Sequence, residues 1–269
     1  MLRICTWNMR RATNTSDAAW AYLESLNPDV ALLQEINSIP NAVSSRYAVL
    51  QRRAHGKSGK PQHCSTAVLV RGTIEKAITL SSSWDWVNDE LQRFDGNLVS
   101  AEVALDSGEL LRVMSVYSPA WPIDTTRLKD VDISRIKLIH SSKVWGTELM
   151  WDALRNVQRD ETPWIVAGDL NSSITFDKHR GGGPGGNQEI QDRMSDLGFV
   201  ECLRSWQGKL TPTFKNPNGG KVIHQIDHLF ASDPLSGKLA RCFTGDPAKV
   251  FVERLSDHLP IIADFQRPA

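Results

Sequence analysis

Residues 164–171 read WIVAGDLN, an apolar run that ends in a glycine and two polar side chains. The run at 164–167 is typical of a buried strand, because it is short, continuous and followed by turn-forming residues. In extended backbone, residues two apart face the same side of a sheet. Asp169 and Asn171 are therefore expected to present a carboxylate and an amide together where this strand ends.

Four other segments place an acid, an amide or a histidine beside an apolar run. TWN closes the first run at Asn8, and LLQE closes the second at Glu35. IDH contains Asp227, and SDHLP places Asp257 and His258 just before the last run. Catalytic groups of open α/β sheets gather at strand ends, because the sheet fixes their positions while the loops face the substrate. Each motif alone is typical of a turn, but five in one chain favour a shared site.

The apolar runs between these motifs predict a mixed α/β chain. The opening reads as a strand, a helix and a strand, and a group of β-rich runs with few helical signals then predicts antiparallel neighbours. No repeat and no linker divides the chain, so residues 1–269 are expected to form one domain. The predicted strands are 2–7, 30–34, 66–70, 74–80, 98–105, 110–117, 164–167, 223–231 and 259–265, and the predicted helices are 16–26, an interrupted 127–158 and 187–197.

The composition is that of an ordinary globular protein, with 269 residues, 41% of them hydrophobic and 23% charged. The 31 Lys and Arg residues balance 31 Asp and Glu residues. Zero net charge argues against a protein that coats nucleic acid by bulk attraction, although it leaves room for a local basic groove. The four scattered cysteines form no C-x-x-C pair and are predicted to be buried thiols.

The N-terminal segment does not resemble a secretory signal. Arg3 interrupts the N-terminal segment MLRICTWNMRR where a secretory signal would be apolar. No apolar run approaches the roughly 18 residues that span a bilayer. We therefore expect a soluble, cytoplasmic protein that has no membrane partner and is a monomer.

The motifs TWN, LLQE, GDLN, IDH and SDHLP occur in this order between residues 6 and 260. In this order they resemble the endonuclease/exonuclease/phosphatase superfamily, the DNase I-like hydrolases, and GDLN with a terminal SDHLP is the most specific part. The resemblance implies a four-layer α/β sandwich, in which two packed mixed β-sheets are flanked by helices. It also implies metal-dependent hydrolysis of a phosphoester.

The implied chemistry needs a cation that neutralises phosphoryl oxygens. Mg²⁺, or Mn²⁺ in its place, suits this task because it prefers oxygen ligands and needs only one or two protein carboxylates. The resemblance makes Glu35 the first metal ligand, with Asn8 beside it on the ligand or on a phosphate oxygen. Asp257 is expected as a further ligand, direct or through water. Asp257 and His258 can share a site only where the backbone turns, which Pro260 favours.

A general base must also activate water. His258 is a candidate, because the ordinary histidine pKa near ~6.5 leaves the ring neutral at neutral pH. Asp227 is expected to orient it by accepting the other ring N–H. Asp169 and Asn171 are expected to position the nucleophile and bind the scissile phosphate. In some relatives the aspartate is itself argued to be the base, and the sequence leaves both residues open for that role.

Tyr117 lies where many relatives carry a histidine, at the end of the strand before GDLN. A tyrosine there resembles the exonuclease III and abasic-site endonuclease branch, which favours a catalytic role for Tyr117 in a nuclease that acts on DNA. The residues after GDLN depart from the abasic-endonuclease pattern, which weighs against a specific repair activity. A phosphatase or phosphodiesterase acting on a small-molecule or lipid phosphoester is the alternative. A scaffold without chemistry is disfavoured, because no candidate catalytic position carries an inert residue.

Three further features bear on the substrate. Residues 51–63, QRRAHGKSGKPQH, predict a loop that either contacts phosphates or is simply solvated. GGGPGG at 181–186 lacks the Lys-Ser/Thr of a P-loop and predicts a mobile loop beside GDLN. Of the nine tryptophans, Trp84, Trp86 and Trp121 are predicted in loops, where they would stack on bases or pack on a neighbour, and Trp145 is predicted in the core.

Overall fold

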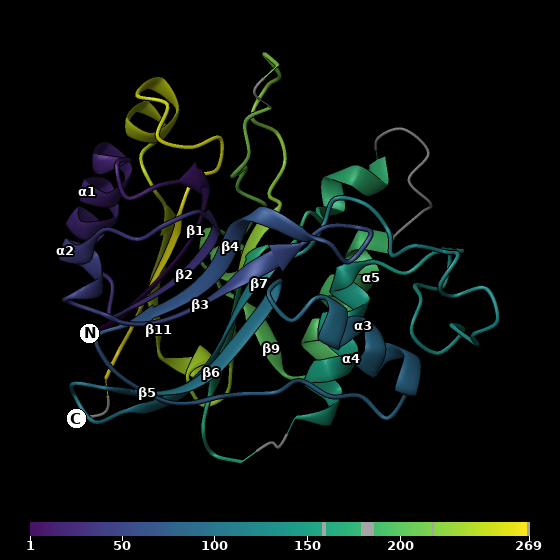
Figure 1. Ribbon diagram of the computed structural model, residues 1–269. Helices are drawn as coiled ribbons and strands as arrows, with labels where there is room; N and C mark the ends of the chain where they lie inside the picture. Colours follow the sequence, from purple (N-terminus) through teal and green to yellow (C-terminus); the bar gives the residue numbers. More distant parts are fainter. Residues whose placement is uncertain (158–159, 179–185, 217, 268–269) are drawn as a thin grey trace.

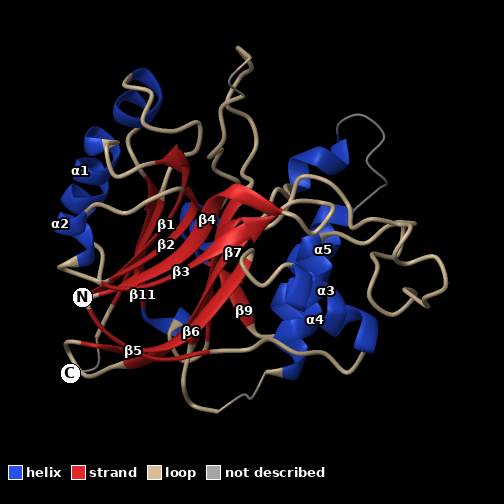
Figure 2. Ribbon diagram, in the orientation of Figure 1, coloured by secondary structure: helices blue, strands red, loops and turns tan. Residues whose placement is uncertain are grey.

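Two β-sheets lie face to face, and helices cover the outer face of each (Figures 1 and 2). The computed structural model describes residues 1–269 except 158–159, 179–185, 217 and 268–269. The arrangement is the four-layer α/β sandwich that the motifs predicted. The predicted mobile loop at 181–186 lies outside the described residues except for Gly186.

The first sheet has six strands in the order β11-β12-β1-β2-β4-β3. β1 and β2 are parallel and are joined by a helix, as the opening of the sequence predicted, while the other pairs are antiparallel. Its strands are β1 (Leu2–Ala12), β2 (Val30–Ile36), β3 (Ala48–His55), β4 (Pro61–Val70), β11 (Leu239–Thr244) and β12 (Ile261–Phe265).

The second sheet has six strands in the order β5-β6-β7-β8-β10-β9. β7 and β8 are parallel and the other pairs are antiparallel, which confirms the antiparallel run predicted for the middle of the chain. Its strands are β5 (Gly72–Ala77), β6 (Leu98–Leu105), β7 (Leu110–Tyr117), β8 (Trp164–Asp169), β9 (Phe199–Glu201) and β10 (Asp227–Ser232).

Three apolar layers hold the sandwich together. One lies between the sheets, one packs the first sheet on α1, and one packs the second sheet on α3, α4 and α5. Figure 2 shows the helices that cover these two outer layers, on either side of the pair of sheets. The helices are α1 (Asp17–Leu26), α2 (Asn41–Ser44), α3 (Asp85–Arg93), α4 (Gly146–Asn156), α5 (Gly186–Asp196) and α6 (Cys202–Gln207), with short helical turns η1 (Ile174–Lys178), η2 (Ser236–Lys238) and η3 (Ala248–Val252).

The space between the sheets changes from apolar to polar along several strands. Alternate side chains of a strand share a face, so Ile4 packs in the inter-sheet core and Asn8, four residues on, lies on the same side. Other strands repeat the change, with Leu32 before Gln34 on β2, Val113 before Ser115 and Tyr117 on β7, Ile165 before Asp169 on β8, and Leu229 after Asp227 on β10. The polar ends of both sheets therefore meet at one end of the sandwich.

Gln34 ties the two sheets together just before the polar end. Its side chain is fully buried, and Nε2 donates to Ser115 Oγ of the facing sheet at 3.0 Å. The same nitrogen donates to Leu32 O at 3.0 Å. These bonds fix the sheets relative to each other, because a buried amide N–H left unpaired would cost free energy. The Oε1 atom of the same amide has no hydrogen-bond partner among the described residues.

The predictions for two segments were wrong. Residues 51–63 are not a loop but most of a hairpin, in which β3 and β4 pair and only 56–60 form the turn. The helix predicted at 127–158 is limited to α4, because side chains before it bond to nearby backbone. Asp124 accepts from Thr126 N at 3.0 Å and Asp132 accepts from Ser134 N at 2.9 Å. Such local bonds compete with helical ones.

One of the tryptophans predicted in loops lies on a helix instead, and two of them pack on a neighbouring layer, as one alternative of the prediction had it. Trp86 lies on α3, and both Trp84 and Trp86 pack against the apolar layer beneath the helices of the second sheet. The four cysteines are free and buried, as predicted. Within the part of the chain that the structure describes, no helix has the length and apolar character needed to cross a bilayer.

Candidate active site

Asn8 joins carboxylates from the two sheets. Its Nδ2 donates to Glu35 Oε1 at 3.3 Å and to Asp169 Oδ2 at 3.0 Å. Its Oδ1 accepts from Arg10 N at 3.0 Å, which fixes the direction of the amide. One buried amide nitrogen thus holds an acid of the first sheet beside an acid of the second.

Backbone irregularities aim these side chains. The register of β1 against β2 shifts after Asn8, and that of β2 against β4 shifts between Leu33 and Ile36. Glu35, inside the second shift, has a φ of 51°, in the left-handed region that residues other than glycine rarely adopt. Bulges of this kind bend a strand and re-aim a side chain, and they are common beside active sites.

Asp169 and Asn171 lie together, but through a turn and not through extended backbone. Asn171 N donates to Asp169 Oδ1 at 3.0 Å, and Asn171 Nδ2 donates to Asp169 Oδ2 at 3.1 Å and to Ser118 O at 2.8 Å. Asn171 has a φ of 48°. Gly168 before them has a φ of 151°, and a Cβ there would lie 1.9 Å from Val116 O, so no other residue fits.

His258 and Asp227 form a buried pair, as predicted. His258 Nδ1 lies 2.9 and 3.0 Å from the two Asp227 oxygens, and Thr213 Oγ1 donates to Asp227 Oδ2 at 2.7 Å. On the other side of the ring, Nε2 lies 4.0 Å from Asp169 Oδ2. The ring of Phe214 packs on the imidazole with centroids 4.9 Å apart. The imidazole therefore lies between two aspartates.

These contacts change the proton affinity of the groups. Burial would lower the pKa of His258, but the charges of Asp227 and Asp169 outweigh it and raise the pKa to about 10. Burial, helped by Asp227 and opposed by His258, raises the pKa of Asp169 to about 7. The two groups titrate as one system. The two aspartates thus favour the imidazolium form of His258, whereas the prediction of a histidine base assumed an ordinary pKa.

Tyr117 lies beside the same acids. It pairs in register with Asp169, and its ring packs with Ala54 and Cys64 of the facing sheet. Burial raises the pKa of Tyr117, and the Glu35 and Asp169 charges add to the effect. The hydroxyl therefore keeps its proton and is available as a hydrogen-bond donor.

Asp257 lies apart from the other acids. Its carboxylate is 3.6 Å from Arg10 Nε and is partly exposed. Among the described residues, the side chains close enough to share a metal ion are Asp169, Asp227 and His258, with ligand atoms within 4.8 Å of one another. That set contains neither Glu35 nor Asp257, so the metal roles of both residues stay predictions.

Sequence reasoning missed several residues that support the site. Ser256 Oγ donates to Asn8 O at 2.7 Å and accepts from His258 N at 3.1 Å, and its place in SDHLP was the available signal. Thr213 and Phe214 belong to no quoted motif. His228, beside Asp227, faces the other way, with Nε2 2.9 Å from Ser172 O, as alternation along a strand requires.

Comparison with known proteins identifies the family of the chain and proteins with a similar fold. The model of the Endonuclease/Exonuclease/phosphatase family matches residues 5–258. No curated protein matches the chain. An AP endonuclease from Archaeoglobus fulgidus has a TM-score of 0.71 and 19% identity over 99% of this chain and 100% of its own.

Two solved structures from Neisseria are also similar. A 3′-5′ exonuclease from Neisseria meningitidis and a 3′ phosphatase bound to a product DNA hairpin each have a TM-score of 0.69 and 18% identity, over 99% of this chain and 100% of theirs. At these identities the likeness establishes the fold, while the family match covers nearly the whole sequence. The chain belongs to the endonuclease/exonuclease/phosphatase family, a family of phosphoester hydrolases.

Proposed function

We propose that this protein is a divalent-metal-dependent phosphodiesterase that acts as a nuclease on DNA. The observation that carries the proposal is the convergence of Glu35 and Asp169 on the Asn8 amide, beside the His258–Asp227 pair. Family membership supports phosphoester hydrolysis. Structures of an AP endonuclease and of a phosphatase bound to a DNA hairpin support DNA as the substrate.

The carboxylate of Glu35 would hold the cation. Mg²⁺ and Mn²⁺ prefer such hard oxygen donors and need only one or two protein carboxylates, with water and substrate oxygens as the other ligands. Asp169, which accepts from the same Asn8 nitrogen, would lie beside the cation and stay available as a base. When bound, the cation neutralises phosphoryl charge and acidifies water. Asn8 aligns the two acids, since its own amide oxygen already accepts from Arg10 N. Asp257 would contact the cation through water, because its carboxylate is already paired with Arg10.

We assign the base role to Asp169 and the phosphate-binding role to His258. Asp227 holds Nδ1 of His258, so the Nε2–H of the imidazolium is left for a phosphoryl oxygen. Asp169 has a pKa near neutrality, which suits a general base. Asn171 and the Tyr117 hydroxyl, which flank this carboxylate, would bind the scissile phosphate.

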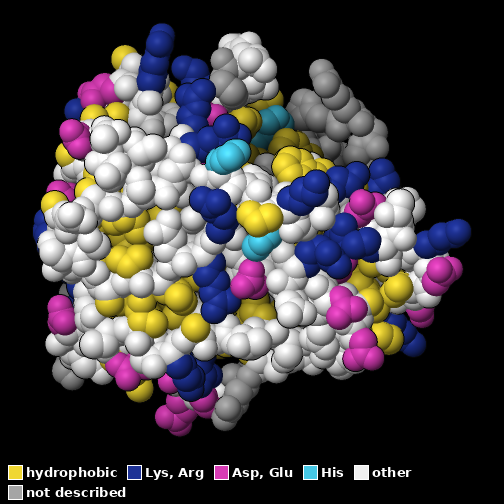
Figure 3. Space-filling model, viewed as in Figure 1, with side chains coloured by type: hydrophobic (Ala, Val, Ile, Leu, Met, Phe, Trp, Pro, Cys, Tyr) yellow, Lys and Arg dark blue, Asp and Glu magenta, His cyan; other side chains and the backbone are white. Residues whose placement is uncertain are grey.

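The β3–β4 hairpin supplies positive charge next to the site. Asn97 fixes the hairpin to the second sheet, because it accepts from His55 N at 2.8 Å and donates to Tyr117 O at 3.0 Å. Figure 3 shows Lys, Arg and His side chains gathered on the upper part of the face in view, where Figure 1 places the polar end of the hairpin. Cations there would neutralise flanking phosphates of a strand. The basic residues of 51–63 are Arg52, Arg53, His55, Lys57, Lys60 and His63.

A substrate panel tests the proposal. Labelled single- and double-stranded DNA and RNA, and small phosphomonoesters and phosphodiesters, are incubated with the protein in Mg²⁺, Mn²⁺ or EDTA. We expect DNA to be cut only with a cation. Phosphate release from small esters with intact strands would instead select the small-phosphoester alternative, and cutting that persists fully in EDTA would rule out a metal-dependent reaction.

A further inference from the structure

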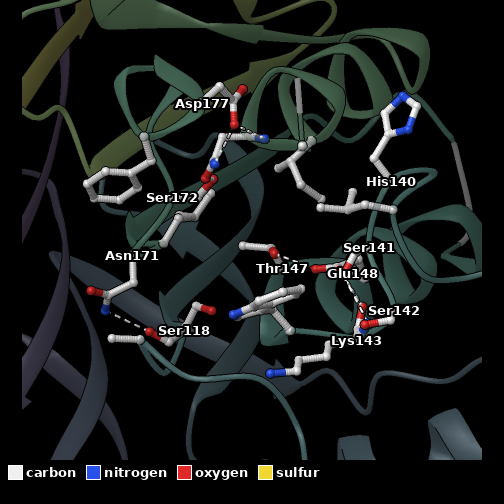
Figure 4. Close-up of a pocket in the computed structure, with 18 residues that line it drawn as sticks. Ser118, His140, Ser141, Ser142, Lys143, Thr147, Glu148, Asn171, Ser172 and Asp177 are labelled. Atoms are coloured by element: carbon white, nitrogen blue, oxygen red, sulfur yellow. Dashed lines mark hydrogen bonds between the residues drawn. The ribbon is translucent and has the colours of Figure 1, made fainter. Parts of the chain in front are cut away.

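A cavity of about 610 Å³ opens beside Asn171, away from the Glu35 side of the site (Figure 4). Its walls come from the segment before α4, the first turn of α4 and the residues that follow β8. Figure 4 shows Asn171 and Ser118 on one side, with Lys143 and Glu148 on the other. We call this cavity the Lys143 pocket. Its volume is that of a small-molecule or single-nucleotide site.

The Lys143 pocket is continuous with the proposed catalytic groups. Asn171, which bonds to Asp169, also lines the cavity, and so does Ser118, whose carbonyl accepts from Asn171. Gly146 opens α4 so close to Ser118 that a Cβ would lie 2.9 Å from Ser118 Oγ. A substrate whose phosphate lies at Asn171 therefore reaches the pocket with its neighbouring group.

Two buried polar atoms in the wall have no hydrogen-bond partner among the described residues. They are Ser118 Oγ, on a side chain that is 1% exposed, and Glu148 Oε1, on a side chain that is 0% exposed. The other Glu148 oxygen accepts from Thr147 Oγ1 at 2.7 Å. Buried polar atoms are nearly always paired, so unpaired ones in a cavity wall indicate a polar occupant.

The remaining wall combines aromatic and apolar surface with polar side chains, which include one lysine and Asp177, whose oxygens already accept from Asn187 N and Gln188 N. Trp145 and Phe176 line the cavity together with Leu138 and Ile190, and Trp145 is only half-buried, unlike the core residue that the sequence predicted. Lys143 is exposed at the cavity and makes no ion pair within the described part of the chain.

We propose that the Lys143 pocket binds one unpaired nucleotide of the substrate, with the base on the Trp145 wall and a phosphate at Lys143. An apolar aromatic wall fits the faces of a base, which stack on aromatic side chains whatever their sequence. Ser118 and Glu148 would bond to polar edges of the base or sugar, and Lys143 matches the anion. The proposal rests on the proposed function, whose substrate it narrows to a strand with an unpaired nucleotide or to a free nucleotide.

Binding without catalysis tests the pocket directly. In EDTA, deoxynucleoside monophosphates and ribose 5-phosphate are titrated by calorimetry against the wild-type chain. We expect the nucleoside monophosphates to bind at least about tenfold more tightly, because only they carry a base. Equal affinity for both, or no binding of either, would overturn the proposal.

Matched variants locate the binding. Lys143→Glu and Trp145→Ala are expected to weaken nucleotide binding at least about tenfold, whereas Lys129→Glu and Trp206→Ala, at exposed positions outside the cavity, leave it unchanged. Lys143 is exposed, so its variant keeps the fold even where that of Trp145 does not. Unchanged affinity in Lys143→Glu would place the nucleotide elsewhere and contradict the proposal.

Cleavage kinetics show whether the pocket takes a nucleotide of a strand or a free nucleotide. They also show whether the pocket or the proposed nuclease activity is wrong if only one of the two fails. A Lys143→Glu effect on KM for a single-stranded oligonucleotide supports a strand as the occupant, and an effect confined to a nucleoside 5′-phosphate ester supports a free nucleotide. Nucleotide binding by a chain that cleaves nothing would contradict the proposed function alone. Cleavage with KM unchanged in Lys143→Glu would contradict the pocket alone.

Discussion

At the scale of single residues, the site depends on how one amide and one imidazole are held. Asn8 donates to Glu35 and Asp169, and His258 lies between Asp169 and Asp227, so each of the three carboxylates has a defined neighbour. Asp169 takes part in both sets of contacts. It is therefore the residue whose charge the rest of the site controls most closely.

Asp169→Asn should abolish most of the activity. The amide keeps the shape of the side chain but cannot accept a proton at neutral pH, so the rate should fall about 10²–10⁴-fold. His258→Gln should lower the rate by a similar factor. The double variant should be no slower than the slower of the two single variants, because the two residues act as a unit. Single-turnover cleavage with Asp89→Asn as an exposed control measures these effects. Independent, additive losses would contradict the shared role.

The rate should depend on pH through the same pair. The Asp169 pKa is raised to about 7, so kcat/KM should fall as the pH drops below this value, and a bound cation shifts that limb to lower pH. His258 has a pKa raised to about 10, so activity should persist until the imidazolium loses its proton near that pH. A rate that keeps rising from pH 8 to 10 would instead identify His258 as the base. The measurement is a pH profile of kcat/KM in wild type and Asp169→Asn.

The sequence indicated most of these residues because polar side chains at strand ends break an apolar pattern. Asn8, Asp169 and Asp227 stand on inward-facing positions where an apolar residue would otherwise fill the inter-sheet core. Ser256 and Thr213 could not be assigned a role, because their partners lie far along the chain and only the folded structure brings them together.

At the scale of elements, the decisive feature is the change from an apolar to a polar face along the strands. The predicted strands that carry the motifs were found, since their apolar runs are continuous and end at turn-forming residues. The segment before α4 was predicted as a helix because its apolar spacing is helical. Asp124 and Asp132 accept hydrogen bonds from nearby backbone N–H groups, and these bonds replace helical ones. The segment is therefore irregular, although its apolar residues still pack against the sheet.

Gly168→Ala tests how β8 positions the acid that follows it. The added Cβ would meet Val116 O at 1.9 Å, and the φ of 151° is unfavourable for alanine, so β7 and β8 must separate. We expect a loss of at least about 3 kcal/mol in the free energy of unfolding, as for severe backbone strain and overpacking. Urea denaturation measures it, with Gly237→Ala as a control at a glycine that has open space around it and no positive φ. A loss below about 1 kcal/mol would contradict the close approach of the two strands.

At the scale of the whole molecule, the buried polar groups at one end of the sandwich reduce stability in exchange for a site. Glu148 is a measurable case. Burial raises its pKa from 4.5 to about 7, so the folded state binds a proton that the unfolded chain has already lost between these values. Its favourable contribution is complete below pH 4.5 and is lost as the pH rises through about 7.

Glu148→Gln should remove this pH dependence. The free energy of unfolding of the wild type, relative to the variant, should fall by up to about 3 kcal/mol from pH 4.5 to 8, at 1.36 kcal/mol per pKa unit. Urea unfolding of both proteins across this range isolates the contribution of Glu148, because Asp169 and His258 titrate in both. Parallel stability curves for the two proteins would show that Glu148 is not a proton-binding group in this range.

The most direct test of the central claim is the metal dependence of DNA cleavage in wild type and in Glu35→Gln. Cleavage of a labelled strand is followed as Mg²⁺ is titrated, then after EDTA and after restoring the cation, with Asp89→Asn as the control. The account predicts cleavage that stops in EDTA, returns with Mg²⁺, and in Glu35→Gln is lost or needs at least about tenfold more cation. Equal cation dependence in wild type and Glu35→Gln would contradict the metal role of Glu35, and cleavage unaffected by EDTA would contradict the mechanism as a whole.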